Sequence, residues 1–186
     1  LTENKMTVRK YFCRATPSFL ARLFVLCNDN TGPMEKALID FAASHGVDYN
    51  TEHTLAPRIF ELPFDSRRKQ MTTLHNTADG FLSVTKGAPE ILLHNAAQYY
   101  DNGECRPMTP AIRSEFKEQA ESFASEALRV LAVGYRISGT ANKSEALEKD
   151  LIFAGFAGFI DPPRKEAFAA VKSCRDIQPV LLKAVI

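Results

Sequence analysis

Apolar residues recur along the chain with two different periods, which predict both helices and strands. A helical repeat opens at Gly32-Pro33 and closes near residues 45–46, and a longer one covers residues 110–127 with charged residues on its opposite face. A short helix is expected from Pro89 to about residue 97, and another helical repeat covers residues 165–177. These segments supply amphipathic helices that could cover a sheet.

Shorter apolar runs between these helices have the pattern of β-strands. They cover residues 55–62, 69–76, 81–86, 128–137 and 151–160. Asp79-Gly80 is a hairpin signal, and residues 151–160 are apolar at both parities, as in a buried strand. Because the elements lack regular βαβ repetition, we predict an α+β fold with a mostly antiparallel, twisted sheet flanked by helices.

The composition fits one globular domain, or one domain with fragments of another. The chain has 186 residues, of which 45% are hydrophobic and 24% are charged. Lysine and arginine number 23 against 22 acidic residues, so no global field would draw the chain to nucleic acid or to an anionic membrane. No apolar run approaches the roughly 18 residues that span a bilayer. We therefore predict neither nucleic acid nor membrane as a partner of this chain.

Cysteine and histidine give no sign of a metal site. The four cysteines are far apart and form no C-x-x-C pair, which also argues against a disulfide framework. The four histidines lack the spacing of metal ligands, and each is expected at the surface or at a helix end. The P-loop and G-x-G-x-x-G motifs are both absent, and no nucleophile lies beside a base.

An aromatic residue followed by cations ends one of the predicted strands. Phe64 could offer a flat apolar face to an adenine ring, and Lys69 lies a few residues beyond it. Lys86 ends the neighbouring hairpin strand, and adjacent strands lie about 5 Å apart, so these side chains could converge on one ligand. Gly87 follows in a small turn that would let a ligand approach the backbone. The alternative is a core phenylalanine with a solvated basic turn and a surface lysine.

Two further residues have a structural and a functional interpretation. Arg129 enters a strand after the long helix, either as another cation of the same site or as an arginine that favours the helix dipole. Glu35 lies in the first turn of its helix, where the dipole stabilises a carboxylate; it could also accept a hydrogen bond from an adenine amino group. Asp161-Pro162-Pro163-Arg164 is rigid and suits either a hinge or a surface loop.

Several of these segments together resemble the P-type cation-transporting ATPases, in the order in which that family has them. The matching motifs are Leu1-Thr2-Glu3-Asn4-Lys5-Met6, Gly32-Pro33-Met34-Glu35, Pro63-Phe64 with Arg68-Lys69 and Met71, Lys86-Gly87-Ala88-Pro89-Glu90, Leu128-Arg129-Val130-Leu131-Ala132 and Asp161-Pro162-Pro163-Arg164. The combination favours the type II subclass of calcium and sodium/potassium pumps. Ser66 and Met34 depart from the residues that are common in the family.

The resemblance implies an adenine-nucleotide pocket that binds ATP. In that pocket Phe64 would stack on adenine, Glu35 would meet the amino edge of the base, and Arg129 would approach the phosphates. The implied site residues are Glu35, Phe64, Lys69, Lys86, Gly87, Arg129 and Leu131. The phosphorylated aspartate of the family and its magnesium loop are not in the sequence, so no catalytic or metal-binding residue is predicted.

The resemblance also implies a domain division and a cellular setting. Residues 1–8 and 159–186 would be stubs of the phosphorylation domain, the latter with a hinge, and residues 9–158 would be the nucleotide-binding domain. The parent would be an integral membrane ATPase that transports a cation with ATP and Mg²⁺, and this part would be cytoplasmic and inactive alone. Its partners would be ATP and the phosphorylation and actuator domains. The apolar tail after Ile177 is expected to be disordered, mispacked or in an intermolecular contact.

Two rival functions stay open at this point. The first is a non-catalytic interaction domain that binds an acidic partner through its basic strand pair. The second is a self-sufficient phosphotransferase, which would form a phosphoenzyme or hydrolyse ATP without another domain.

Overall fold

The computed structural model describes residues 5–141 and 143–161, which form a single sheet with helices on both faces. The strands are β1 (Thr7–Cys13), β2 (Arg58–Asp65), β3 (Gln70–Thr77), β4 (Gly80–Gly87), β5 (Ala96–Asp101), β6 (Glu104–Pro107), β7 (Arg129–Ser138) and β8 (Leu151–Ile160). The helices are α1 (Pro17–Leu26), α2 (Pro33–Ser44), α3 (Tyr49–Leu55), α4 (Pro89–Asn95) and α5 (Pro110–Ser125), with a 3₁₀ turn η1 (Glu145–Glu148). Among these described helices, none is long and apolar enough to cross a membrane.

The sheet confirms the predicted α+β class with mostly antiparallel pairing. Its strand order is β2-β3-β4-β7-β8-β5-β6, and β1 also pairs with β8. The β5–β8 pair is parallel, whereas the other paired strands run antiparallel. The predicted hairpin turn joins β3 to β4, with Thr77 opposite Gly80.

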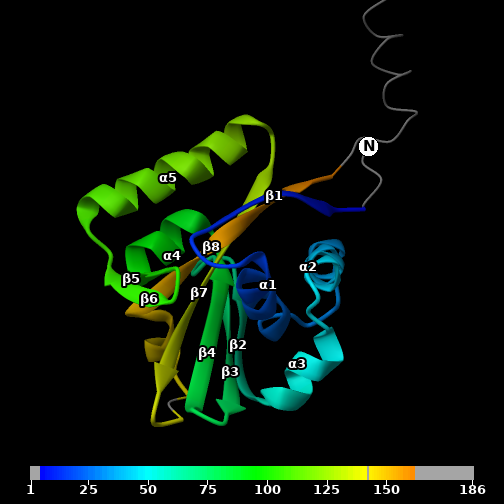
Figure 1. Ribbon diagram of the computed structural model, residues 1–186, viewed down its shortest axis with the longest axis vertical. Coiled ribbons are helices and arrows are strands. Elements are labelled where there is room, and N and C mark those ends of the chain that lie inside the picture. Colours follow the sequence, from blue (N-terminus) through cyan, green and yellow to red (C-terminus); the bar gives the residue numbers. More distant parts are fainter. Residues whose placement is uncertain (1–4, 142, 162–186) are drawn as a thin grey trace, which may run out of the picture.

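Helices cover the two faces of the sheet with different groups of residues. Helices α1, α2 and α3 lie on one side, and α4 and α5 lie on the other (Figure 1). Because side chains alternate along a strand, β7 contributes to both cores: Val133 and Tyr135 pack with α1 and α2, whereas Ala132 packs with α4 and α5. The sheet is therefore the common wall of two hydrophobic cores.

Local sequence explains where several helices begin. The Thr16 and Thr109 hydroxyls each accept a hydrogen bond from a backbone amide in the first turn of α1 and α5, and proline follows each threonine. Asp48 caps α3 in the same way. The prediction covered α5 and α2 closely. It gave no element for β1, α1, β6 or most of α3.

Some predicted boundaries and one predicted location were wrong. The helix that begins at Pro89 ends at Asn95, and the next residues form β5, because they pair with both β8 and β6. Leu55 ends α3 instead of beginning a strand. His75 is fully buried in β3, where its Nδ1 lies 2.8 Å from the carbonyl oxygen of Ala56, so it is neither a surface nor a capping residue. The predicted helix over residues 165–177, the hinge beyond Asp161 and the apolar tail lie outside the described residues.

Candidate functional site

A cavity of about 520 Å³ opens beside the N-terminus of α2, on the face of the sheet that α1 and α2 cover. It is bounded by the loop before α2 and by residues of β2, β3, β4 and β7. The lining residues are Met6, Asp29, Thr31, Gly32, Pro33, Met34, Glu35, Glu61, Pro63, Phe64, Met71, Lys86, Gly87, Arg129 and Leu131. The size is within the usual range of small-molecule sites, which are mostly apolar with a few placed polar groups.

Lys86 and Glu35 form an ion pair in the wall of this cavity. Lys86 lies near the end of β4, opposite Met71 on one side and Val133 on the other, and is only 4% exposed. Its Nζ donates to both carboxylate oxygens of Glu35, at 2.6 and 2.5 Å. An ammonium buried this deeply needs a counter-charge, and Glu35 supplies it.

Glu35 is placed by the way α2 begins. Gly32 precedes the helix without a side-chain cap, Pro33 occupies the first turn, and Glu35 is the acidic residue of that turn. Its carboxylate is thus favoured by the helix dipole as well as by Lys86. The buried Asn28 holds the same segment, because its side-chain amide donates to the Glu35 carbonyl oxygen at 3.0 Å.

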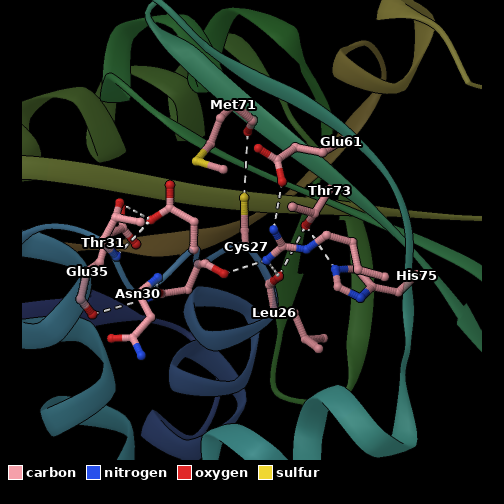
Figure 2. A network of polar contacts seen from close by, with 12 residues as sticks. Leu26, Cys27, Asn30, Thr31, Glu35, Glu61, Met71, Thr73 and His75 are labelled. Carbon is pink, nitrogen blue, oxygen red and sulfur yellow. Dashed lines mark hydrogen bonds and ion pairs between the residues drawn. The ribbon is translucent and has the colours of Figure 1, made fainter.

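Asn28 belongs to a polar network between the end of α1 and the sheet, shown in Figure 2. Arg58 donates to the carbonyl oxygens of Leu26 and Asn28 and to a carboxylate oxygen of Glu61. The Cys27 thiol points to the Met71 carbonyl oxygen, and burial raises the pKa of that thiol. The loop that carries the acidic wall of the cavity is therefore tied to β2 and β3.

Asp29 and Thr31 line the cavity from that loop. The Thr31 hydroxyl and amide both donate to Oδ1 of Asp29, at 2.7 and 3.2 Å. Partial burial alone would raise the pKa of Asp29, but these hydrogen bonds and the charge of Lys86 hold it below its usual value. The carboxylate thus keeps its charge at neutral pH.

Phe64 offers an exposed aromatic ring at the mouth of the cavity. It lies near the end of β2 and is 64% exposed, which is unusual for so large an apolar side chain. Arg129 and Leu131 line the cavity from β7 and share one face of that strand. Arg129 is exposed, so its guanidinium can reach a ligand that extends out of the cavity.

Lys69 is the one residue of the predicted site that does not line this cavity. It precedes β3 instead of beginning it, and its backbone is left-handed with φ 53°, so its side chain leaves the alternation of the strand. Its Nζ pairs with Glu90 at 3.3 Å, and both side chains are more than half exposed. The sequence thus placed the correct strand, β3, at the site, but the Lys69 side chain lies outside the cavity.

Gly87 lies in the lining for a reason of packing. An added Cβ would stand 2.5 Å from the carbonyl oxygen of Lys69 and 2.7 Å from the Cβ of Gln70. Any other residue would push β4 away from the start of β3, to which Ala88 is also bonded through the Lys69 carbonyl oxygen at 3.0 Å. Glycine therefore keeps the end of β4, and with it Lys86, in place.

Comparison of the whole chain with known proteins gives its family. Residues 21–166 match the family model described as P-type ATPase, cytoplasmic domain N. The chain belongs to the P-type ATPase family. It is 34% identical to a calcium-transporting ATPase of Listeria monocytogenes over 94% of this chain and 23% of that protein. It is 33% identical to calcium-transporting ATPase 1 of Lactococcus lactis, with the same two shares.

A third relative has a less specific name. The cation-transporting ATPase pma1 of Synechocystis is 34% identical over 82% of this chain and 18% of that protein. The chain thus spans less than a quarter of the length of these curated relatives. The family match concerns the cytoplasmic domain N, and it covers the strands and the helix that carry the cavity.

Sequence reasoning about this P-type domain missed several residues of the cavity wall. Asp29, Thr31 and Glu61 were not among the predicted site residues, yet each lines the cavity. For Asp29 and Thr31 a signal existed, since the run Asn-Asp-Asn-Thr-Gly-Pro is a loop that leads directly into the predicted helix. Glu61 gave no such signal, because an acidic residue within a strand is usually a solvated one. Among the described residues, no group of acidic, histidine and cysteine side chains could hold a metal ion.

Proposed function

We propose that this domain binds ATP, with the adenine ring inside the cavity and the phosphates toward its open side. The observation that carries the proposal is the convergence of Phe64, Lys86, Glu35 and Leu131 from four separate elements on one cavity of about 520 Å³. An exposed aromatic ring beside a buried cation and a carboxylate suits a flat heterocycle with hydrogen-bonding edges.

Each wall has a specific task in this proposal. Phe64 stacks on the adenine ring, and Leu131 with Met71 supplies apolar contact on the inner side. Glu35 accepts a hydrogen bond from the exocyclic amino group beside its two contacts with Lys86, since each carboxylate oxygen can accept more than one hydrogen bond. The third N–H of Lys86 donates to a ring nitrogen. The side chains that line the cavity therefore offer both the apolar contacts and the hydrogen-bonding groups that an adenine ring needs.

Phosphate binding rests on exposed cations. Arg129 stands at the open part of the lining, and Lys69 lies nearby in the turn after β2. Contacts made in solvent are weak, so we expect modest affinity for ATP. Mg²⁺ would enter with the phosphates and supply charge neutralisation there, with ligands that lie outside the described residues.

In the parent chain, this domain would deliver the γ-phosphate of ATP to an aspartate of the phosphorylation domain. We infer that the parent is an ATP-hydrolysing, membrane-embedded cation pump, because the relatives over nearly the whole of this chain bear the names of calcium-transporting and cation-transporting ATPases. Its partners would be the phosphorylation and actuator domains, which it would meet by closure of the domains. Residues 9–158 would be the nucleotide-binding unit, and residues 159–186 would lead back to the phosphorylation domain.

Titration with ATP, followed by the backbone amide signals of the chain, tests the proposal. Phe64→Ala should raise the dissociation constant by about fivefold to 150-fold, since stacking of a base on an aromatic side chain contributes about 1–3 kcal/mol. Ile137→Ala is the matched control, because Ile137 is also an exposed apolar residue of the sheet but does not line the cavity. No saturable shift around Phe64, Lys86 and Arg129 in the unaltered chain would sink the proposal.

Charge reversal separates ATP from an acidic protein partner. Lys69→Glu leaves Phe64 intact, and Lys69 lies outside the cavity. For an adenine pocket, Phe64→Ala should weaken binding more than Lys69→Glu does. For an acidic partner held by the basic turn, the order of the two effects should reverse.

A further inference from the structure

A buried carboxylate lies behind the proposed nucleotide pocket, on the opposite face of the sheet. Glu148 ends η1 and is 4% exposed. Its carboxylate accepts hydrogen bonds from Arg68, from Nε2 of Gln70 at 2.7 Å and from the Thr72 hydroxyl at 3.1 Å. Gln70 and Thr72 share one face of β3, whereas Met71 between them faces the cavity.

Arg68 connects this carboxylate with the other side of the sheet. One terminal nitrogen of its guanidinium pairs with Glu148, and the other donates to the carbonyl oxygen of Pro63 at 2.7 Å. Pro63 immediately precedes Phe64. The fork of one arginine therefore joins η1 to the residue before the exposed ring.

The backbone at this point has little other support. The pairing of β2 with β3 shifts between Leu62 and Asp65, so Pro63 and Phe64 have no partners in the regular ladder. Pro63 also lacks an N–H group. The contact from Arg68 to the Pro63 carbonyl oxygen thus supplies a restraint that the sheet does not.

We propose that Glu148 is a positioning residue of the nucleotide pocket, which acts through Arg68 to hold the Pro63–Phe64 segment and so to preorder the Phe64 ring. The proposal rests on the proposed function for its ligand, but its mechanical part does not need ATP. A buried ion pair is weak evidence for stability, because an apolar pair of the same volume would often serve as well. A role in fixing the geometry of the ring explains why a charge lies here.

Two substitutions at this cluster separate positioning from mere stability. Glu148→Gln keeps the shape but removes the charge that anchors Arg68, and we expect the dissociation constant for ATP to rise roughly threefold to tenfold. Thr72→Val is the matched control: it removes another donor to the same carboxylate at a fully buried site without touching Arg68 or Pro63. The dissociation constant of Thr72→Val for ATP should stay within about twofold of that of the unaltered chain, although the melting temperature of this variant falls.

A double-mutant cycle with Phe64→Ala tests whether the effect passes through the ring. Glu148→Gln should lose its effect on ATP affinity in the Phe64→Ala background, because no ring is left to position. If Glu148→Gln destabilises the chain too far, Arg68→Lys replaces it. That change keeps the charge opposite Glu148 but loses the fork that also reaches Pro63, and it should raise the dissociation constant by a similar factor.

The motion of the ring at position 64 can be measured without any nucleotide. The chain contains no tryptophan, so Phe64→Trp introduces a single fluorescent reporter. Its anisotropy should decay faster with Glu148→Gln, and not with Thr72→Val. The positioning role would be overturned if Glu148→Gln and Thr72→Val weakened ATP binding equally, or if Glu148→Gln had the same effect in the Phe64→Ala background. It would also be overturned if Glu148→Gln left the anisotropy decay of the tryptophan unchanged. A loosened reporter in a chain that fails to bind ATP would uphold positioning and remove the ligand assignment instead.

Discussion

Where α5 covers the sheet, aromatic rings fill the core, whereas the face under α1 and α2 combines an apolar core with a cavity and the buried ion pair of Lys86 and Glu35. Under α5, Phe116 packs on Phe153 at 5.4 Å and on Phe12 at 5.3 Å between ring centroids, and Phe123 meets Phe156 at 5.2 Å. Under the beginning of α2, Lys86 and Glu35 stand beside a space of about 520 Å³.

This difference follows from how each helix meets the sheet. Helix α5 lays its apolar stripe along the strands, so large rings close the space between them. Helix α2 instead presents its first turn to the cavity, where backbone N–H groups, Glu35 and the preceding loop are polar. A space that large apolar side chains do not fill remains there. The site therefore lies where a covering helix begins, and not where a helix crosses the sheet.

Phe116→Ala should cause the largest loss of unfolding free energy and should affect only the aromatic core under α5. Phe116 is 2% exposed, and truncation of a buried phenylalanine costs about 3–5 kcal/mol of unfolding free energy. Urea unfolding measures the loss. The remaining folded chain should bind ATP as before, since α5 does not line the cavity. A large change in ATP affinity at equal folded fraction would show that the two sides are not independent.

A pH dependence should come from His75, on the side that α1 covers. Burial lowers the pKa of His75 to about 4, and Arg58 adds to the effect. Between about pH 6.5 and 4, His75 is therefore protonated in the unfolded chain but neutral in the folded chain. The contribution of His75 to the unfolding free energy is complete above pH 6.5 and is lost as the pH falls to 4. The expected loss is about 3 kcal/mol.

Unfolding curves from pH 7 to 4 test this contribution. His75→Gln should flatten the slope relative to the unaltered chain, and the difference between the two removes the shared titration of the carboxylates. His94→Gln is the control, because His94 is exposed on α4. Parallel slopes for all three chains would contradict the assignment.

Lys86→Met should have the smallest effect on stability and should sharpen the role of the ion pair. It leaves Glu35 without its partner, but the cavity lets water reach that carboxylate, so we expect a loss of about 2 kcal/mol, less than for a fully enclosed pair. Glu35→Gln added to it should recover part of the loss in thermal unfolding. A double variant that loses as much stability as the two single variants together, or more, would contradict this coupling.

The sequence by itself determined the type of most elements and the class of the sheet. The period of α5, the Asp-Gly turn before β4 and the doubly apolar β8 are local signals, and local signals can be taken from one segment at a time. The same holds for Phe64, Lys86, Gly87, Arg129 and Leu131 as candidates, because the motifs that carry the family resemblance are short and contiguous.

Only the tertiary structure decided which of those candidate residues contact one another and which are buried. The pairing of β5 with β8 turned the end of a predicted helix into a strand, and no local pattern encodes a partner that is more than fifty residues away. The left-handed backbone at Lys69 took one predicted side chain out of the cavity, whereas the entry of α2 brought Asp29 and Thr31 into it. Burial of Lys86 against Glu35, and of Glu148 against Gln70 and Thr72, depends on which faces the folded sheet covers. That is settled only when all the strands are in register.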